Sequence, residues 1–195
     1  MSAPRVIGVT GGSGSGKSTL SRELERRGWL FLDCDAIYHE LLKTDPSLLA
    51  AIERRFPGTV TQGALDRKKL GAIVFADEAA LLDLNAITHA AVKAEVLRRL
   101  DSCRTGAVID AIGLFEGGLA ELCDITVAVT APEEMRIRRL MARDGISEDY
   151  ARSRIAAQRS DEWFRSHCDY TLVNDGNLDA TATKYLAFFD NIGII

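Results

Sequence analysis

The sequence predicts a three-layer α/β/α fold with a five-stranded parallel sheet, a helical insertion and a lid. Two observations predict this class. Short runs rich in β-branched residues alternate with longer helical patterns, which is typical of a parallel sheet covered by helices. The runs are also apolar almost throughout, as in strands that are buried on both faces. The expected strands are Val6–Thr10, Leu30–Asp33, Ala107–Ala111, Ile125–Thr130 and Tyr170–Asn174.

The composition excludes several classes of protein. The chain of 195 residues has 28 acidic and 24 basic residues, a net charge of −4, whereas a general nucleic-acid binder is normally basic. Its apolar stretches are far shorter than the ~20 residues of a membrane span, and the N-terminus leads directly into a strand pattern without a secretory signal. The widely spaced Cys34, Cys103, Cys123 and Cys168 form no C-x-x-C pair. We therefore expect a cytoplasmic protein with reduced thiols that binds neither nucleic acid nor membrane.

The segments between the expected strands differ greatly in length. One helix of about twelve residues, over 17–28, joins the first two strands, which is enough for a simple crossover. Residues 34–106 separate the next two strands and show helical periodicity almost throughout. The excess predicts a helical subdomain at the C-terminal edge of the sheet, where doubly wound folds bind ligands. Within a single domain we assign residues 35–103 to the helical insertion, 132–165 to the lid, and 1–34, 104–131 and 166–195 to the core.

The longest helical pattern of the insertion covers residues 77–100. Its apolar residues at helical spacing are Leu81, Leu84, Ile87, Ala91, Val92 and Val96. Such a stripe predicts a face buried in the core. His89 lies on the same helix, and its spacing alone favours a packed or solvated side chain over a ligand-binding one.

The most specific motif is G-x-x-x-x-G-K-[ST], which Gly11–Ser18 matches directly after the first expected strand and at the start of a helix. Glycines let backbone N–H groups curve around phosphate oxygens, and the helix N-terminus adds unpaired donors. Lys17 supplies charge for the β- and γ-phosphates, and the Ser18 hydroxyl can ligate Mg²⁺. The motif predicts a P-loop NTPase fold and a nucleoside triphosphate site rather than a flexible Gly/Ser turn. The expected contacts are Gly12, Ser13, Gly14, Ser15, Gly16, Lys17, Ser18 and Thr19.

Two carboxylates, Asp33 and Asp35, close the second expected strand. Alternate residues of a strand point to the same side, so both face the phosphate loop if the strand extends that far. A carboxylate there can accept a proton from an acceptor hydroxyl or position Mg²⁺. We take Asp35 as the preferred catalytic base and Asp33 as the next candidate. The alternative is that Asp35 only caps the helix over 36–43.

Asp110 ends the third expected strand. An unpaired acid is costly to bury on an apolar strand, which favours a partner in a Mg²⁺-bound water or in the phosphate loop over a capping role. We expect Asp110 to hold Mg²⁺ through water, alongside Ser18, and to lie beside the substrate. Glu116 is a weaker candidate, because a solvated loop acid explains it equally well.

Residues 133–165 contain eight arginines and no lysine. They form two short expected helices, the first of which begins at Thr130–Glu133 with a capping box. Arg136, Arg139 and Arg143 share one helix face. A mobile flap that carries arginines suits phosphate binding and exclusion of water, whereas interspersed acids also allow a solvated helix pair laced with ion pairs. We expect Arg139 and Arg143 to be functional and the other arginines to lie on the surface.

The turn Asn174-Asp175-Gly176 follows the last expected strand. In folds of this class the turn lies beside the adenine, and its backbone can read the edge of the base. We therefore include Asn174 and Gly176 among the nucleotide contacts. A glycine also simply suits a tight turn, so this signal is weak by itself.

Together these features resemble the dephospho-coenzyme A kinase family over nearly the whole chain. The matching motifs are T-G-G-x-G-S-G-K-S-T at Thr10–Thr19, D-x-D at Asp33 and Asp35, L-D-R at Leu65–Arg67, L-N-x-I-x-H at Leu84–His89, Arg139-x-x-x-Arg143-Asp144, Ala156-Ala157-Gln158 and Asn174-x-Gly176. The chain departs from the family pattern in two places. Ala90 replaces a proline after His89, and Asp110-Ala111-Ile112-Gly113-Leu114 replaces D-V-P-L-L. Both changes affect local backbone shape more than chemistry.

The resemblance implies ATP-dependent phosphorylation of the ribose 3′-hydroxyl of dephospho-CoA, with ATP and Mg²⁺ bound and dephospho-CoA as the small-molecule partner. It implies a fold like that of nucleoside-monophosphate kinases. It also implies Asp35 as the base, Arg139 and Arg143 in the lid, and His89 in the dephospho-CoA pocket, to which we add Lys93 as a substrate contact. We expect a monomer or a weak homo-oligomer.

Three other classes of protein fit the sequence less well than this family. A shikimate kinase would have a Gly-Gly-Gly run for its acceptor, and the chain has none. A regulatory GTPase would have the guanine-reading N-K-x-D motif, which is also absent, although Asp110–Gly113 matches D-x-x-G. A catalytically silent ATP-binding module is disfavoured by the intact Lys17, Ser18 and carboxylates.

Overall fold

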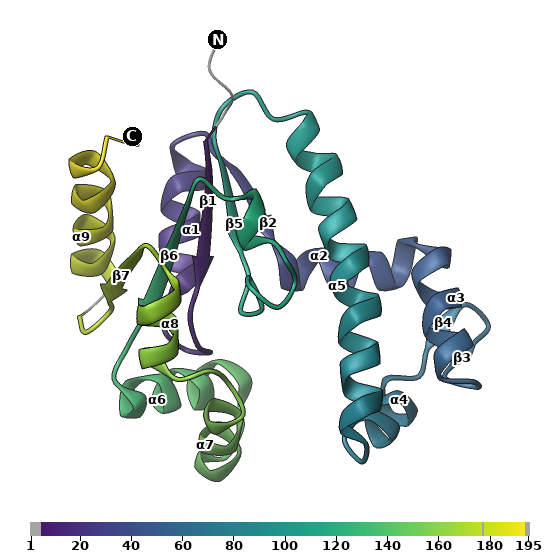
Figure 1. Ribbon diagram of the computed structural model, residues 1–195. Coiled ribbons are helices and arrows are strands. Elements are labelled where there is room, and N and C mark those ends of the chain that lie inside the picture. Colours follow the sequence, from purple (N-terminus) through teal and green to yellow (C-terminus); the bar gives the residue numbers. More distant parts are fainter. Residues whose placement is uncertain (1–4, 177, 194–195) are drawn as a thin grey trace. The chain divides into compact units, whose positions relative to one another are not determined.

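The computed structural model describes residues 5–176 and 178–193, and the chain separates into two compact units (Figure 1). The sheet unit comprises the chain up to Leu32, Cys103–Leu114 and the chain from Leu119 onward. The helical unit comprises Asp33–Ser102 and Phe115–Gly118. Each unit has its own hydrophobic core.

Five strands form the sheet: β1 (Val6–Thr10), β2 (Leu30–Asp33), β5 (Ala107–Asp110), β6 (Ile125–Thr130) and β7 (Tyr170–Val173). Their order is β2-β5-β1-β6-β7. β1 pairs in parallel with β5 and β6, and β6 pairs in parallel with β7. The predicted five-stranded parallel sheet of a P-loop NTPase fold is confirmed. Only the expected last residues Ala111 and Asn174 fall outside the strands.

The helices of the sheet unit are α1 (Lys17–Arg26), η1 (Ala120–Leu122, 3₁₀), α6 (Glu133–Asp144), α7 (Glu148–Ala156), α8 (Asp161–His167) and α9 (Leu178–Asn191). The hydroxyls of Ser147 and Ser160 cap α7 and α8 by accepting backbone hydrogen bonds. The capping box expected at Thr130–Glu133 is wrong. Thr130 still belongs to β6, and α6 follows Pro132, which has no side-chain cap.

The sheet is covered on both faces. Leu20 and Leu24 of α1 and Tyr185 and Phe189 of α9 are fully buried in one cluster with strand residues such as Val127. Gly8, in the middle of β1, faces the other side, because successive strand residues alternate. A Cβ at Gly8 would lie 2.7 Å from Cys123 Sγ and 2.8 Å from Leu114 Cδ2. The segment around η1 therefore packs directly on the central strand.

The helical unit contains α2 (Cys34–Thr44), α3 (Pro46–Arg55), α4 (Arg67–Val74), α5 (Glu78–Asp101) and a hairpin of β3 (Val60–Thr61) and β4 (Ala64–Leu65). Each helix follows an aspartate whose carboxylate accepts backbone N–H hydrogen bonds, namely Asp33, Asp45, Asp66 and Asp77. These caps satisfy donors that the first turn leaves open. The hairpin was not expected, because two-residue strands are too short to show alternation.

The core of the helical unit is made by apolar residues of all four helices, including Ile52, Phe56 and Leu70. The residues of α5 that are buried are Ala80, Thr88, Val92 and Val96, with Leu84, Ile87 and Ala91 partly buried. Leu81 is 36 % exposed, so its predicted place on the buried face is wrong. The buried row of α5 repeats at multiples of four residues from Ala80, and Leu81 lies beside that row.

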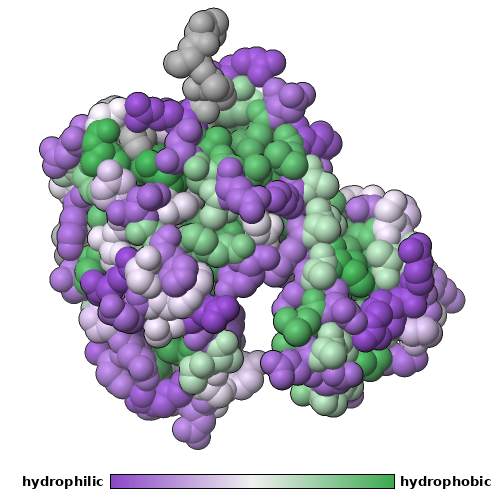
Figure 2. Space-filling model, in the orientation of Figure 1, coloured by the Kyte–Doolittle hydropathy of each residue, from purple (hydrophilic) through white to green (hydrophobic). Residues whose placement is uncertain are grey.

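Hydrophilic residues predominate on the face of the molecule drawn in Figure 2. Among the described residues, no helix combines the length and hydropathy needed to cross a membrane. All four cysteines are free, with Cys34 and Cys103 buried and the other two half-buried. Burial raises the pKa of Cys123 to about 12 and that of Cys168 to about 11. Both of these thiols therefore stay protonated at neutral pH.

Candidate active site

The phosphate loop connects β1 to α1, and glycines determine its shape. Gly11, Gly14 and Gly16 have φ values of 134°, 78° and 97°, a region that residues with a Cβ rarely adopt. The loop is closed by the N–H of Ser15, which donates to the carbonyl oxygen of Gly12 at 3.2 Å. The glycine spacing of the motif therefore has a local conformational cause in this chain.

Lys17 and Ser18 form the first turn of α1. The Lys17 Nζ donates to the carbonyl oxygen of Gly11 at 2.8 Å, which holds the ammonium group over the loop. Ser18 is exposed, and α1 has no acidic residue in its first turn. The positive end of the helix dipole is therefore not offset by an acidic side chain of its own first turn, as a site for a polyphosphate requires.

Asp110 lies at the C-terminal end of β5 and is 8 % exposed. The parallel register places it beside Val9, two residues before the loop. Its Oδ2 accepts a hydrogen bond from Ser21 Oγ at 3.0 Å, one helical turn beyond Lys17 on α1. The carboxylate is thus held against the same helix whose first turn carries Ser18.

Arg139 of α6 contacts the phosphate loop through its guanidinium group. Its Nη1 donates to the carbonyl oxygens of Gly14 at 3.1 Å and Ser15 at 3.4 Å, and its Nη2 donates to Asn174 Oδ1 at 3.1 Å. Asn174, which is buried, donates through Nδ2 to the carbonyl oxygen of Ser15 at 2.8 Å, and its Oδ1 also accepts from Thr181. The side chain of Asn174 therefore joins α6 and the start of α9 to the loop.

Arg136 is the most important correction to the sequence prediction, which placed it on the surface. It is 5 % exposed, and its Nε donates to the carbonyl oxygen of Ser13 at 3.0 Å. Its Nη1 lies 3.3 Å from Asp161 Oδ1. Burial lowers the pKa of Arg136, and Asp161 and Glu133 oppose this effect. The helix face shared by Arg136 and Arg139 is thus the face that contacts the loop.

Arg143 lies one turn further along the same helix. Its side chain is 62 % exposed, and it binds Asp144 through Nε at 2.6 Å and Nη2 at 2.9 Å. Arg154 donates to the same carboxylate at 2.7 Å. Asp144 directly precedes Gly145, whose φ of 65° ends α6. A role of Arg143 at the nucleotide stays a prediction.

Asp33 and Asp35 both belong to the helical unit, and they differ in environment. β2 ends at Asp33, and α2 begins at the next residue, so the strand alternation that was expected to align the two side chains does not apply. Asp33 caps α2 by accepting from the N–H of Ala36 at 3.0 Å. Capping by Asp35 is therefore wrong. Asp35 instead lies exposed in the first helical turn.

His89 and Lys93 lie one turn apart on α5 in the helical unit. His89 is half-buried, and the Lys93 ammonium lies beside Gly118, where a Cβ would be 2.9 Å from Nζ. Arg67, from the L-D-R motif, contacts His39 Nδ1 through Nη2 at 3.2 Å. Arg67 also opposes the rise in the pKa of Tyr38 that burial causes. Arg67 and His39 are therefore candidate polar contacts in the helical unit. The sequence pointed to Arg67 only through the L-D-R motif and did not point to His39.

Three residues around the loop were not predicted from the sequence: Arg136, Gln158 and Asp161. Gln158 was quoted only as part of a family motif, yet its side chain makes two hydrogen bonds to Ser13. A signal was available for Arg136, because it shares a helix face with Arg139. No local pattern marks Gln158 or Asp161, since the partner of Gln158 lies 145 residues away in the chain and that of Asp161 lies 25 residues away.

Known proteins resemble this chain over nearly its full length. The family model described as "Dephospho-CoA kinase" matches residues 5–180. A dephospho-CoA kinase of Deinococcus radiodurans is 41 % identical over 182 residues, which cover 91 % of this chain and 87 % of that protein. One of Corynebacterium diphtheriae is 38 % identical over 181 residues, or 90 % of both chains.

A solved structure agrees with these sequence relatives. The crystal structure of the Thermus thermophilus protein TT1252 superposes with a TM-score of 0.81 and 34 % identity, covering 97 % of this chain and 98 % of that one. The phosphate loop, Asp35 and the arginines of α6 all lie within the matched residues 5–180. The chain belongs to the dephospho-CoA kinase family.

Proposed function

We propose that this protein transfers the γ-phosphoryl group of ATP to the ribose 3′-hydroxyl of dephospho-CoA, which gives coenzyme A in the last step of its biosynthesis. The observation that carries the proposal is the family match over residues 5–180. The match favours this reaction over shikimate phosphorylation and over a regulatory GTPase switch.

The donor side is assigned to the sheet unit. The backbone of residues 14–18 and the Lys17 ammonium would bind the β- and γ-phosphates, since the N–H of Ser13 is already bonded to Gln158. Mg²⁺ prefers oxygen ligands and keeps several waters, which fits the exposed hydroxyl of Ser18 and, through water, the carboxylate of Asp110. When bound, Mg²⁺ neutralises charge on the transferring group.

The acceptor side is assigned to the helical unit, with Asp35 as the base and His89 and Lys93 as contacts for dephospho-CoA. The 3′-oxygen forms a bond to the γ-phosphorus while the bond from that phosphorus to the β,γ-bridging oxygen breaks. The hydroxyl proton passes to the Asp35 carboxylate, and ADP leaves. The donor and acceptor residues belong to different units, and transfer requires that ATP and the hydroxyl be held in contact.

The lid supplies charge to the transferring group in this proposal. Arg139 already contacts the loop at Gly14, and Arg143 follows on the next turn of α6. A guanidinium that meets the equatorial oxygens of the γ-phosphoryl group stabilises the charge of the transition state. We also propose a cytoplasmic location, in keeping with four free cysteines.

The test is an ADP-release assay with dephospho-CoA, shikimate and nucleoside monophosphates offered separately. We expect rapid ADP release with dephospho-CoA only, and ³¹P NMR should place the new phosphate on the ribose 3′-oxygen. Turnover with shikimate or a nucleoside monophosphate in place of dephospho-CoA would contradict the proposal.

A further inference from the structure

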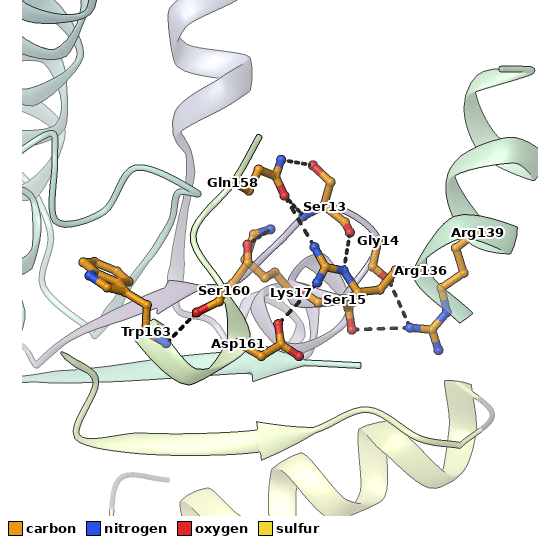
Figure 3. A network of polar contacts seen from close by, with 11 residues as sticks. Ser13, Gly14, Ser15, Lys17, Arg136, Arg139, Gln158, Ser160, Asp161 and Trp163 are labelled. Atoms are coloured by element: carbon orange, nitrogen blue, oxygen red, sulfur yellow. Dashed lines mark hydrogen bonds and ion pairs between the residues drawn. The ribbon is translucent and has the colours of Figure 1, made fainter. Parts of the chain in front are cut away.

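Gln158 binds the phosphate loop with both ends of its side-chain amide (Figure 3). Its Oε1 accepts a hydrogen bond from the backbone N–H of Ser13 at 2.8 Å, and its Nε2 donates to Ser13 Oγ at 2.7 Å. Gln158 lies in the short linker between α7 and α8, and it is half-buried. One amide therefore engages the main chain and the hydroxyl of a single loop residue.

Arg136 completes the same contact. Its Nε donates to the carbonyl oxygen of Ser13 at 3.0 Å, and its Nη2 lies 3.5 Å from Gln158 Oε1. All the polar groups of Ser13 are thus bonded, and every partner comes from the segment 136–158. Asp161, in the first turn of α8, offsets the buried charge of Arg136. Gln158, Arg136, Asp161 and Ser13 form one connected network, which we call the Ser13 clamp.

The glycines around Ser13 depend on the same contact. A Cβ at Gly12 would collide with the guanidinium of Arg136, and a Cβ at Gly14 would lie 2.8 Å from the backbone carbonyl oxygen of Arg136. The loop and α6 therefore approach each other more closely than any residue with a side chain would allow. A glycine-rich loop without such support would be conformationally free, and a ligand would have to order it on binding.

We propose that Gln158 is a positioning residue for the nucleotide: the Ser13 clamp holds the phosphate loop in its binding conformation before the nucleotide arrives. This inference rests on the proposed nucleotide site but not on the identity of the acceptor. An amide is suited to this task because it accepts from N–H and donates to a hydroxyl while adding no charge beside a polyanion. The clamp also joins the loop to α6 and α8, the segment that was predicted to be the lid.

The experiment compares wild type, Gln158→Ala, Ser13→Ala and the double variant, with Glu162→Gln as a control at an exposed position of α8. Calorimetry measures the affinity for ADP, and steady-state kinetics measure the KM values for ATP and for the acceptor. Thermal unfolding without ligand gives the melting temperature of each variant. We expect Gln158→Ala to weaken ADP binding and raise the KM for ATP about tenfold, as loss of two hydrogen bonds allows. The KM for the acceptor stays unchanged. Ser13→Ala, which removes one bond, should weaken ADP binding about threefold.

The double variant tests the contact itself. If the clamp acts through the pair, the double variant binds ADP no more weakly than Gln158→Ala, because the partner is already lost. Additive losses, or a lower melting temperature with unchanged ADP affinity, would overturn the inference and leave Gln158 a packing residue. Ser13→Ala keeps the test decisive if Gln158→Ala does not fold. If the wild-type protein binds ADP but does not phosphorylate dephospho-CoA, the proposed function is contradicted and the inference about Gln158 is not.

Discussion

The phosphate loop and the helical unit hold their candidate residues in different ways. Around the loop, Lys17, Arg139 and Asn174 all bond to loop carbonyl oxygens at 2.8 to 3.1 Å. In the helical unit, Asp35 is exposed. Within the part of the chain that the structure describes, neither its side chain nor that of His89 has a hydrogen-bond or ion-pair partner. The donor-side side chains are therefore held by polar contacts with the loop, whereas the side chains of Asp35 and His89 are not held by polar contacts with described residues.

The two sites therefore differ in how much ordering we expect substrate binding to require. Phosphate groups are compact anions, and a loop whose glycines and side-chain contacts are already fixed can bind them without paying further conformational entropy. The candidate acceptor residues belong to the helical unit, and we expect their final arrangement to depend on the bound substrate. Variants on the donor side should therefore change nucleotide affinity, and variants on the acceptor side should change turnover.

The largest effect is expected for Lys17→Ala. The Lys17 ammonium lies over the loop that is expected to bind the β- and γ-phosphates, and its loss should lower kcat/KM by about 10³-fold, the magnitude typical of a charge that stabilises phosphoryl transfer. Steady-state kinetics with ATP as the varied substrate measures this, with Lys43→Ala on α2 as the exposed control. Near wild-type activity in Lys17→Ala would refute the assignment of the loop.

Asp35→Asn tests the acceptor side. Loss of the base should lower kcat about 10²-fold, while ADP affinity changes little because Asp35 belongs to the helical unit. Asp45→Asn is the matched control in the same unit: an asparagine still caps α3, so only the charge changes. Equal losses of turnover and nucleotide affinity in Asp35→Asn would assign Asp35 to nucleotide binding or folding and would remove the contrast between the two sides.

Two arginines of α6, Arg139 and Arg143, are expected to differ in their effects on ADP affinity and on kcat. Arg139→Ala removes contacts to the loop, so ADP affinity should fall about tenfold, in line with about 1.5 kcal/mol for a hydrogen bond from a charged group. Arg143→Ala should leave ADP affinity unchanged and lower kcat only, because the Arg143 guanidinium, which binds Asp144, would act on the γ-phosphoryl group that ADP lacks. Calorimetry and kinetics on the two variants decide this, and a loss of ADP affinity in Arg143→Ala would contradict it.

The smallest effect concerns acid stability at the end of α6. Hydrogen bonds from Arg143 and then Arg154 lower the pKa of Asp144 to about 2, below its ordinary 3.8. Because the folded-state pKa is depressed, the stabilisation is fully present above about pH 4 and is lost as the pH falls toward 2. Asp144→Asn should therefore reduce the free energy of unfolding by less than about 1 kcal/mol at neutral pH, since these pairs are largely exposed.

Denaturant unfolding of wild type and Asp144→Asn between pH 7 and pH 2 measures this difference. It should be constant down to about pH 4 and shrink below that value. Asp45→Asn in the helical unit is a suitable control, because asparagine retains the cap of α3. A difference that grows as the pH falls would contradict the assigned ion pairs.

The sequence by itself determined the sheet, the phosphate loop and the family. Each of these depends on local information: apolar runs mark strands buried on both faces, and glycines at fixed spacing mark a backbone that must adopt positive φ around an anion. The same kind of local signal identified Lys17, Ser18 and Arg139 as candidates for the nucleotide site.

Two features became visible only in the tertiary structure: which residues hold the phosphate loop, and which of two neighbouring carboxylates is not used as a helix cap. Arg136 and Gln158 meet Ser13 across more than 120 residues of chain, and no pattern within either segment encodes that meeting. Asp33 and Asp35 differ because the strand ends between them, so that the carboxylate of Asp33 is used by the N–H of Ala36. Long-range packing chooses among chemically similar side chains, and that choice becomes visible only when the chain is folded.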